Sequence, residues 1–470
     1  MDYDIYSQLT IRAKIEQNKE GYMEAFKHQE VQLCASILSK AETPDDALIA
    51  WSSLQAQHPD LVGIVCLDSY RHSALPPSVK KYTNSSLNYL VPYFESEHIY
   101  FLEDDLLKDM LSSNEVKFGI DYTLMLDTNI ASYINKLVRG ESLGRMQNKV
   151  IPLIDEILHD DLNFDSLFYM AENVKNIISL IGNEQRSKIS FWRSIDKDFR
   201  SNLVSLQIFR SIDCKEYKRT SNPKPVFTYR NAARRAINFA YDFYASEIGR
   251  EHILDFVLVQ RLILLQLIGM VKIQLSSNRN ARNKMGDYFN YIHEVVGAYF
   301  DRESIIAHKY FLDRNNISIL NKIQKGMPIS GLLKKLDNIA WDMAVPRFME
   351  KLIASMTSAG EGRYFIPMFV SFDSKLRELL SLFPVKGAIY SKSEEQLIPL
   401  PKINTMDYFQ SHGCGDYLEH LCSDPVKSER MSRPKPTRLS VHRCIKREYK
   451  ELREIISSNK KMQPTQKAHG

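Results

Sequence analysis

Two apolar segments far apart in the chain end in the same way, each on an aspartate followed by a helical pattern. VKFGIDYTLMLD ends at Asp127, and YFIPMFVSFD ends at Asp373. Both are predicted to be buried strands, because they are rich in apolar and β-compatible residues and are followed at once by polar residues. In an open parallel α/β sheet the carboxyl ends of the strands line the ligand crevice. We therefore expect the two carboxylates to lie side by side.

The rest of the chain has mainly helical patterns and shows no internal repeat. Its 470 residues suffice for two or three core-forming units, and a content of 44% hydrophobic and 25% charged residues is typical of a globular protein. The first 114 residues are mainly helical in pattern, although DLVGIVCLD and HIYFL are also compatible with short strands. These patterns predict a helix-rich α/β protein.

Three features bear on the cellular compartment. The apolar segment that starts at Ile253 contains Asp255, Gln260 and Arg261, which would be costly in lipid, so we expect a buried core helix. The N-terminus shows no apolar signal segment. Six scattered cysteines do not predict a disulfide framework. We therefore expect a cytoplasmic protein that does not enter a membrane.

Several carboxylates in one crevice repel one another, and the arrangement is tolerated mainly when a divalent cation neutralises them. Mg²⁺ or Mn²⁺ suits a site made only of oxygen ligands. Such an ion lowers the pKa of a bound water for attack on phosphorus and stabilises the charge on the leaving oxygen. The two strand ends therefore favour metal-dependent hydrolysis of a phosphodiester.

The two motifs resemble those of a known nuclease family. Asp127, followed by Thr128 and Asn129, resembles the first motif of the PIN domain, a metal-dependent nuclease fold whose first strand ends in an aspartate. The segment FVSFD, with Ser371 and Asp373, resembles the late motif of that family. The resemblance implies a PIN-like parallel sheet core, and it makes RNA a more expected substrate than DNA.

The resemblance also implies two further acids between these motifs. Glu172, in LNFDSLFYMAENV, is the candidate for the glutamate of an early helix. Asp342, in LDNIAWDMAVPRFMEKL, is the candidate for the aspartate of the helix before the late strand, with Asp337 as its substitute. Asp127, Glu172, Asp342 and Asp373 would then bind one or two Mg²⁺ or Mn²⁺ ions. Asn129 and Ser371 would orient the carboxylates.

The motifs lie much further apart than in a compact PIN domain, so the resemblance implies a large helical insertion. The predicted organisation is a mainly helical region at 1–114, core segments at 115–182 and 326–400, the insertion at 183–325 and a basic extension at 401–470. From Lys427 to Gly470 the chain has thirteen Lys or Arg and four Asp or Glu. Such a basic segment suggests contact with a polyanion, although many basic tails are only solvated surface.

Each proposed ligand also has an ordinary structural interpretation. Asp127 and Asp373 stand where helix N-caps are common. Glu172 could be a solvated acid on a helix surface. Asp342 lies next to an apolar face, where a charge needs a partner. Capping and metal binding do not exclude each other, since a helix N-terminus also favours an anion.

Arginine-rich segments suggest where a nucleic acid would bind. RNAARRAI and SSNRNARNK combine cations with nearby aromatic residues, the combination that single-stranded nucleic acids require. The alternative is a solvated helix face, and composition alone does not separate RNA from DNA. The predicted contacts are Arg230, Arg234, Arg235, Arg279 and Arg282.

Three other interpretations stay open. Arg302 and His308, in RESIIAH, resemble the R-x(4–6)-H motif of the HEPN ribonucleases, which act without metal. HGC, HLC and HRC near the C-terminus could supply zinc ligands, but the usual C-x-x-C spacing is missing. A non-catalytic PIN-like scaffold that binds nucleic acid or protein is the competing class. For the enzyme, the PIN resemblance suggests a toxin-like or defence effector.

Overall fold

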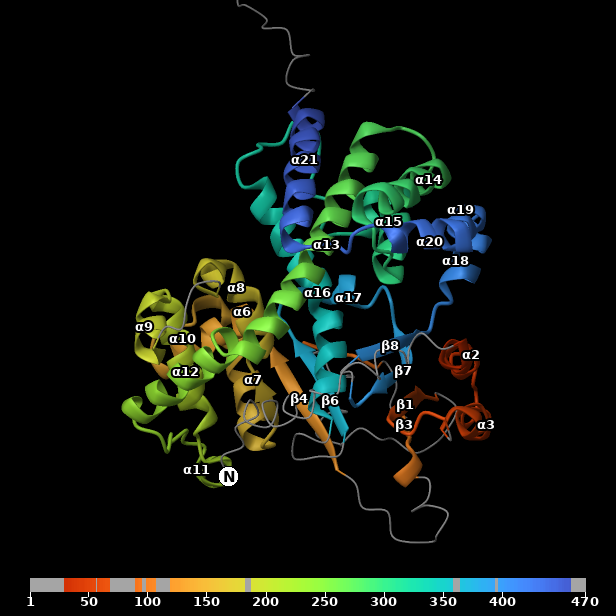
Figure 1. Cartoon of the computed structure of the whole chain (residues 1–470). Helices are drawn as coiled ribbons and strands as arrows, with labels where there is room; N and C mark the ends of the chain where they lie inside the picture. Colours follow the sequence, from red (N-terminus) through yellow and green to blue (C-terminus); the bar gives the residue numbers. More distant parts are fainter. Residues whose placement is uncertain are drawn as a thin grey trace, which may run out of the picture. The chain divides into compact units, whose positions relative to one another are not determined.

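The computed structural model describes residues 29–55, 57–67, 89–94, 99–106, 119–181, 187–357, 364–393 and 396–457. The chain divides into two compact units. Unit 1 contains the chain up to Leu254 together with Pro346–Arg377 and Pro384–Lys402. Unit 2 contains Asp255–Val345, Glu378–Phe383 and the chain from Ile403 onward. Figure 1 shows many helices and two small sheets, which confirms the helix-rich α/β class.

The first sheet of unit 1 contains both strands that end near the paired aspartates. Strands β4 (Ile120–Leu126) and β6 (Tyr364–Val370) are parallel neighbours, with Leu126 opposite Val370. Strand β5 (Asn163–Asp165) extends the parallel set on the other side of β4, and β2 (Leu90–Pro92) pairs antiparallel with β6. The ends of β4 and β6 are therefore next to each other, as expected from the sequence.

The second sheet of unit 1 is antiparallel, in the order β3-β1-β7-β8. Its strands are β1 (Leu61–Cys66), β3 (Ile99–Leu102), β7 (Val385–Ser391) and β8 (Gln396–Pro401). Helices α2 (Gln29–Leu38) and α3 (Pro44–Gln55) contribute to a hydrophobic core with this sheet. Within the region predicted to be mainly helical, DLVGIVCLD thus contains β1 and HIYFL contains β3, which pair with each other, and β1 also pairs with the distant β7.

A group of helices follows β4 in unit 1, and Figure 1 shows them gathered beside that strand. In this group α10 contacts both α6 and α12, and α12 also contacts α9. The helices are α6 (Thr128–Val138), α7 (Gln147–His159), α8 (Leu167–Ile181), α9 (Lys188–Ser194), α10 (Lys197–Arg210), α11 (Cys214–Thr220) and α12 (Tyr229–Tyr244), with a 3-10 turn η3 (Gly144–Met146) before α7.

Within the described residues, unit 2 is built from helices. Helices α13 and α16 each have residues in both units, as does α17. The predicted C-terminal extension folds as helices up to Ser457. The elements are α13 (Glu247–Ser276), α14 (Ala281–Tyr291), the π-helical turn η4 (Ile292–Val296), α15 (Asp301–Leu312), η5 (Arg314–Asn316), α16 (Leu332–Met356), α17 (Ser374–Leu380), α18 (Thr405–Ser411), α19 (Gly415–Cys422), α20 (Asp424–Ser432) and α21 (Arg438–Ser457).

Helix α13 is long and apolar enough to cross a membrane by length and composition alone. In the structure 72% of its most apolar window is buried inside the protein. Three of its polar side chains donate to protein partners, since Gln260 and Arg261 bond to Asp337 and Gln266 donates to the carbonyl of Ala298. These contacts are typical of a core helix.

Candidate active site

Asp127 lies directly after β4, in the turn that leads into α6. The residue is 6% exposed, and its backbone N–H donates to the carbonyl of Val370 on β6 at 3.1 Å. Although it occupies the N-cap position of α6, its carboxylate makes no capping hydrogen bond to that helix. The structural interpretation as an N-cap therefore does not account for this carboxylate.

The carboxylate of Asp127 instead receives side-chain donors from two directions. Ser371 Oγ, just after β6, donates to Asp127 Oδ2 at 2.8 Å, and Asn129 Nδ2 lies 3.4 Å from the same oxygen. Ser371 is itself fully buried. The parallel pairing of β4 and β6 positions the hydroxyl, because Ser371 and Asp127 each follow one of the two opposed residues Val370 and Leu126. These donors fix the orientation of the carboxylate.

Glu172, on α8, is the second acid at this end of the sheet. Thr128 Oγ1 donates a hydrogen bond to Glu172 Oε2, which ties the turn after β4 to α8. The other oxygen, Oε1, accepts a bond from Lys175 Nζ at 3.1 Å, and both side chains are less than one-third exposed. Glu172 is therefore held by a hydroxyl on one side and by a cation on the other.

The surroundings shift the titration of Asp127. Its pKa is raised from 3.8 to about 6, chiefly because burial penalises the charged form. The hydrogen bond from Ser371 lowers the pKa, whereas the negative charge of Glu172 raises it. A buried acid next to a second acid is costly for the fold, and such groups concentrate at functional sites.

Asp373 lies close to Asp127 through a shared hydroxyl. Its backbone N–H donates to Ser371 Oγ at 3.1 Å, the same oxygen that donates to Asp127. Its carboxylate is exposed and caps α17, since Oδ1 accepts bonds from the N–H groups of Lys375 at 2.8 Å and Leu376 at 3.3 Å. For Asp373, then, the capping role is present in the structure.

The last two candidate acids, Asp342 and its substitute Asp337, lie on the part of α16 that belongs to unit 2. Asp342 is half-buried there. Asp337 accepts bonds from Arg261 Nη1 at 2.7 Å and from Gln260 Nε2 at 3.1 Å, so its carboxylate already has an ion-pair partner. In the part of the chain that the structure describes, no three His, Cys, Asp or Glu side chains are grouped closely enough to hold a metal ion. The histidines and cysteines of HGC, HLC and HRC are among these described residues.

Asp165 is a buried acid that sequence reasoning did not select. It ends β5, is 4% exposed, and its pKa is raised to about 7 because of burial. Oδ1 accepts the N–H of Leu167 at 2.8 Å, whereas Oδ2 is buried without a hydrogen-bond partner. The only local signal in the sequence was the aspartate of NFDS directly before a helical pattern.

The five predicted nucleic-acid contacts differ in how their charges are used. Arg279 pairs with Asp287, and Arg282 pairs with Asp416 at 2.7 Å. Arg235 stacks on the ring of Phe227, with 4.4 Å between the guanidinium carbon and the ring centroid. The last two, Arg230 and Arg234, are exposed on α12 and form no ion pair with a described residue.

The metal-independent alternative involves two buried side chains of α15. Arg302 is 6% exposed and lies over the ring of Phe383, and His308 is 1% exposed. His308 Nδ1 lies 2.9 Å from the hydroxyl of Tyr408, and burial lowers the pKa of the imidazole to about 4. At neutral pH this histidine is uncharged, and in this conformation it is shielded from solvent.

No protein-family model, no curated protein and no solved structure matches this chain.

Proposed function

We propose that this protein is a metal-dependent nuclease that hydrolyses RNA phosphodiester bonds at the end of β4. One observation carries the proposal: a buried carboxylate, Asp127, follows the central parallel strand, is oriented by Ser371, and has Glu172 nearby. A buried acid beside a second acid lowers the stability of the fold. Its presence therefore favours a function that compensates for this cost. The carboxyl edge of a parallel sheet is also where ligands of α/β proteins bind.

The donors at this edge fit Mg²⁺ or Mn²⁺. They are carboxylate oxygens, the ligands that these hard cations prefer, and Mg²⁺ is commonly held by one or two carboxylates with waters and substrate phosphates completing its shell. Asp127 and Glu172 would hold the ion, and Asp373 could approach it with its exposed carboxylate. When bound, the ion would supply a water of lowered pKa and charge stabilisation at the phosphate.

The chain's own residues would prepare the site. The hydrogen bonds from Ser371 and Asn129 both end on Oδ2 of Asp127, so we assign the other oxygen, Oδ1, to the cation. Thr128 holds Glu172 by Oε2, and Lys175 would be displaced from Oε1 by a bound ion. Lys175, which pairs with Glu172, would provide a positive charge near an incoming phosphate. With a pKa of about 6, Asp127 is mostly ionised at neutral pH and able to bind a cation.

The first test is cleavage of labelled single-stranded RNA and DNA with Mn²⁺, with Mg²⁺ and with EDTA. We expect RNA to be cut with either metal and not in EDTA. Glu172→Gln should lower the rate by about tenfold or more, because it removes one charge that attracts the ion. The gel assay should report fragments of defined length.

The same assay separates the two other classes of function. Cleavage that resists EDTA and is lost in His308→Ala would contradict the metal hypothesis and favour the HEPN-like chemistry. Absence of cleavage in every condition, together with retained RNA binding, would favour the scaffold. The scaffold interpretation is supported by the lack of a group of three metal-ligating side chains among the described residues. The cytoplasm stays the expected compartment, and a toxin-like or defence role stays a proposal.

A further inference from the structure

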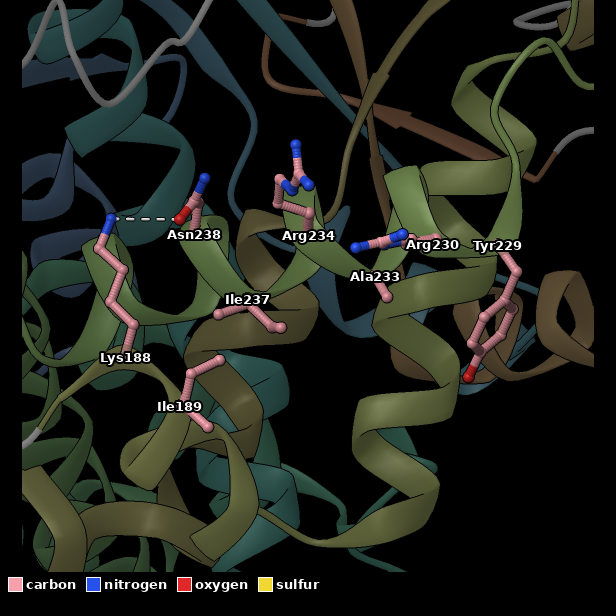
Figure 2. A pocket seen from close by; sticks show the side chains of 8 residues that line it. All are labelled: Lys188, Ile189, Tyr229, Arg230, Ala233, Arg234, Ile237 and Asn238. Carbon is pink, nitrogen blue, oxygen red and sulfur yellow. Dashed lines mark hydrogen bonds between the residues drawn. The ribbon is translucent and has the colours of Figure 1, made fainter.

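Helices α9 and α12 of unit 1 form a groove that no part of the proposed active site uses. It has a volume of about 610 Å³ and lies on the surface of the helical group that follows β4. Figure 2 shows Lys188 and Asn238 near one end of the groove and Tyr229 near the other. The lining residues are Lys188, Ile189, Tyr229, Arg230, Ala233, Arg234, Ile237 and Asn238.

The groove carries positive charge that nearby acids neutralise only in part. None of its lining residues is acidic, and neither Arg230 nor Arg234 forms an ion pair with a described residue. The two arginines are four positions apart on α12, so they lie about one helical turn from each other. Lys188 is partly neutralised, because its Nζ lies 3.7 Å from Asp242 and donates to Asn238 at 3.2 Å.

Apolar and aromatic surface accompanies these charges. Ile189 is 50% exposed and Tyr229 is 70% exposed, so both side chains are accessible to a ligand. Figure 2 shows Ile189 and Ile237 next to each other between the two ends. The groove thus combines cations, an accessible ring and an apolar floor.

We infer that this groove binds a single strand of nucleic acid, with Arg230 and Arg234 contacting phosphates and Tyr229 stacking on a base. Charge complementarity favours a polyanion, and the exposed ring and apolar floor favour one that carries flat bases. The inference deepens the proposed function, since it assigns a substrate-binding surface outside the site of hydrolysis. The binding of a single strand does not depend on the proposed function. Only the identification of that strand as the substrate of the enzyme rests on it.

The other basic surfaces are weaker candidates. A second pocket of about 650 Å³ in unit 2 is lined by Arg279, Lys284 and Arg314. Arg279 is already paired with Asp287, and Lys284 donates to Gln274 at 2.8 Å. Asp313 also lines that pocket and opposes an anion. The groove between α9 and α12 has no such opposing acid among its lining residues.

The test measures binding of fluorescent single-stranded RNA and DNA to the full chain carrying Asp127→Asn, so that cleavage does not interfere. We expect Arg230→Gln with Arg234→Gln to weaken binding about tenfold or more at low salt. The slope of log affinity against log salt should become shallower by about 1.4, because each phosphate contact on a single strand contributes roughly 0.7. Tyr229→Ala should cost on the order of tenfold with little change in that slope.

A matched control removes two other exposed cations of unit 1, in Arg145→Gln with Lys218→Gln. This control should keep the affinity and slope of the parent. The inference is overturned if the control loses as much as the groove variant, or if the groove variant keeps the parental slope. It is also overturned if polyglutamate competes as well as RNA and Tyr229→Ala has no effect, because the groove would then accept any acidic chain. Since binding is read without cleavage, failure of the nuclease proposal would be seen separately.

Discussion

Replacing Asp127 by asparagine is expected to lower RNA cleavage by about a hundredfold or more and, at the same time, to stabilise the folded protein at pH 8. The amide keeps the size of the side chain and an oxygen that can accept a hydrogen bond, but it cannot carry the negative charge that attracts a cation. The opposite signs of the two effects are the signature of a buried functional acid.

The stability gain follows from the raised pKa of Asp127, about 6 in the fold against an ordinary value of 3.8. Because the fold favours the neutral acid, the protein has its full stability at pH values below 3.8, the ordinary pKa of the group. It loses stability as the pH rises towards about 6, the pKa of Asp127 in the fold. Above about pH 6 the loss is constant, at about 3 kcal/mol of unfolding free energy. The asparagine variant should therefore gain little at pH 4 and most at pH 8.

Urea unfolding at pH 4 and pH 8 checks the stability effect, and the metal-dependent cleavage assay checks the catalytic one. Asp165→Asn is the matched control, because Asp165 is also buried with a raised pKa, and its carboxylate bonds to the backbone of Leu167 rather than to a proposed ligand, although β5 pairs with β4. Relative to the normal protein, the Asp165→Asn variant should gain stability progressively as the pH rises to about 7. It should cleave RNA at the normal rate. Normal cleavage by Asp127→Asn, or an equal loss in Asp165→Asn, would contradict the proposed role.

Trp51→Ala should cost about 3–5 kcal/mol of unfolding free energy, the largest effect that we expect from a single core substitution. Trp51 is fully buried in the core that α2 and α3 form with the antiparallel sheet. No backbone shift readily fills such a hole, since Trp51 belongs to a core whose other members, among them Leu38, Leu54 and Leu61, are also buried. Urea unfolding measures the loss.

Trp51→Phe separates lost packing from lost polarity. The indole Nε1 is buried without a hydrogen-bond partner, so removing it forfeits no bond, and the phenylalanine variant should lose much less than the alanine variant. Gly63 provides a second check, because a Cβ there would lie 2.9 Å from the Trp51 ring. Gly63→Ala should destabilise the normal protein and be better tolerated beside Trp51→Phe. Equal costs for the alanine and phenylalanine variants would contradict this packing argument.

The sequence predicted the central pairing of the fold because that pairing has a strong local signal. β4 and β6 are long apolar segments that end in polar residues, and parallel strands bring their carboxyl ends to one edge, so the proximity of Asp127 and Ser371 could be inferred. The strands β2 and β5 have three residues each, too few for a periodic pattern. The antiparallel sheet was also not foreseen, since it joins β1 and β3 near the N-terminus to β7 and β8, which come much later in the chain.

The candidate site was predictable only where strand order determines it. The contact between Thr128 and Glu172 depends on how α8 packs, which the spacing of apolar residues does not specify. The same limit applies to the groove. The exposed face with Arg230 and Arg234 could be read from α12, but Lys188 and Ile189 come from α9, and their place beside α12 is a result of tertiary packing. Asp165 was overlooked because its strand is so short.

Unit 1 is built from separate stretches of chain, and this has a consequence for its synthesis. β4 is complete at Leu126, but its neighbour β6 begins only at Tyr364, and β1 likewise awaits β7. At ribosomal rates of about 5–20 residues per second, the edge of β4 that pairs with β6 waits roughly ten to fifty seconds for its partner. Unpaired edges are prone to association with other chains. A nascent or truncated chain that lacks β6 and β7 would therefore require protection by chaperones to stay free of aggregates.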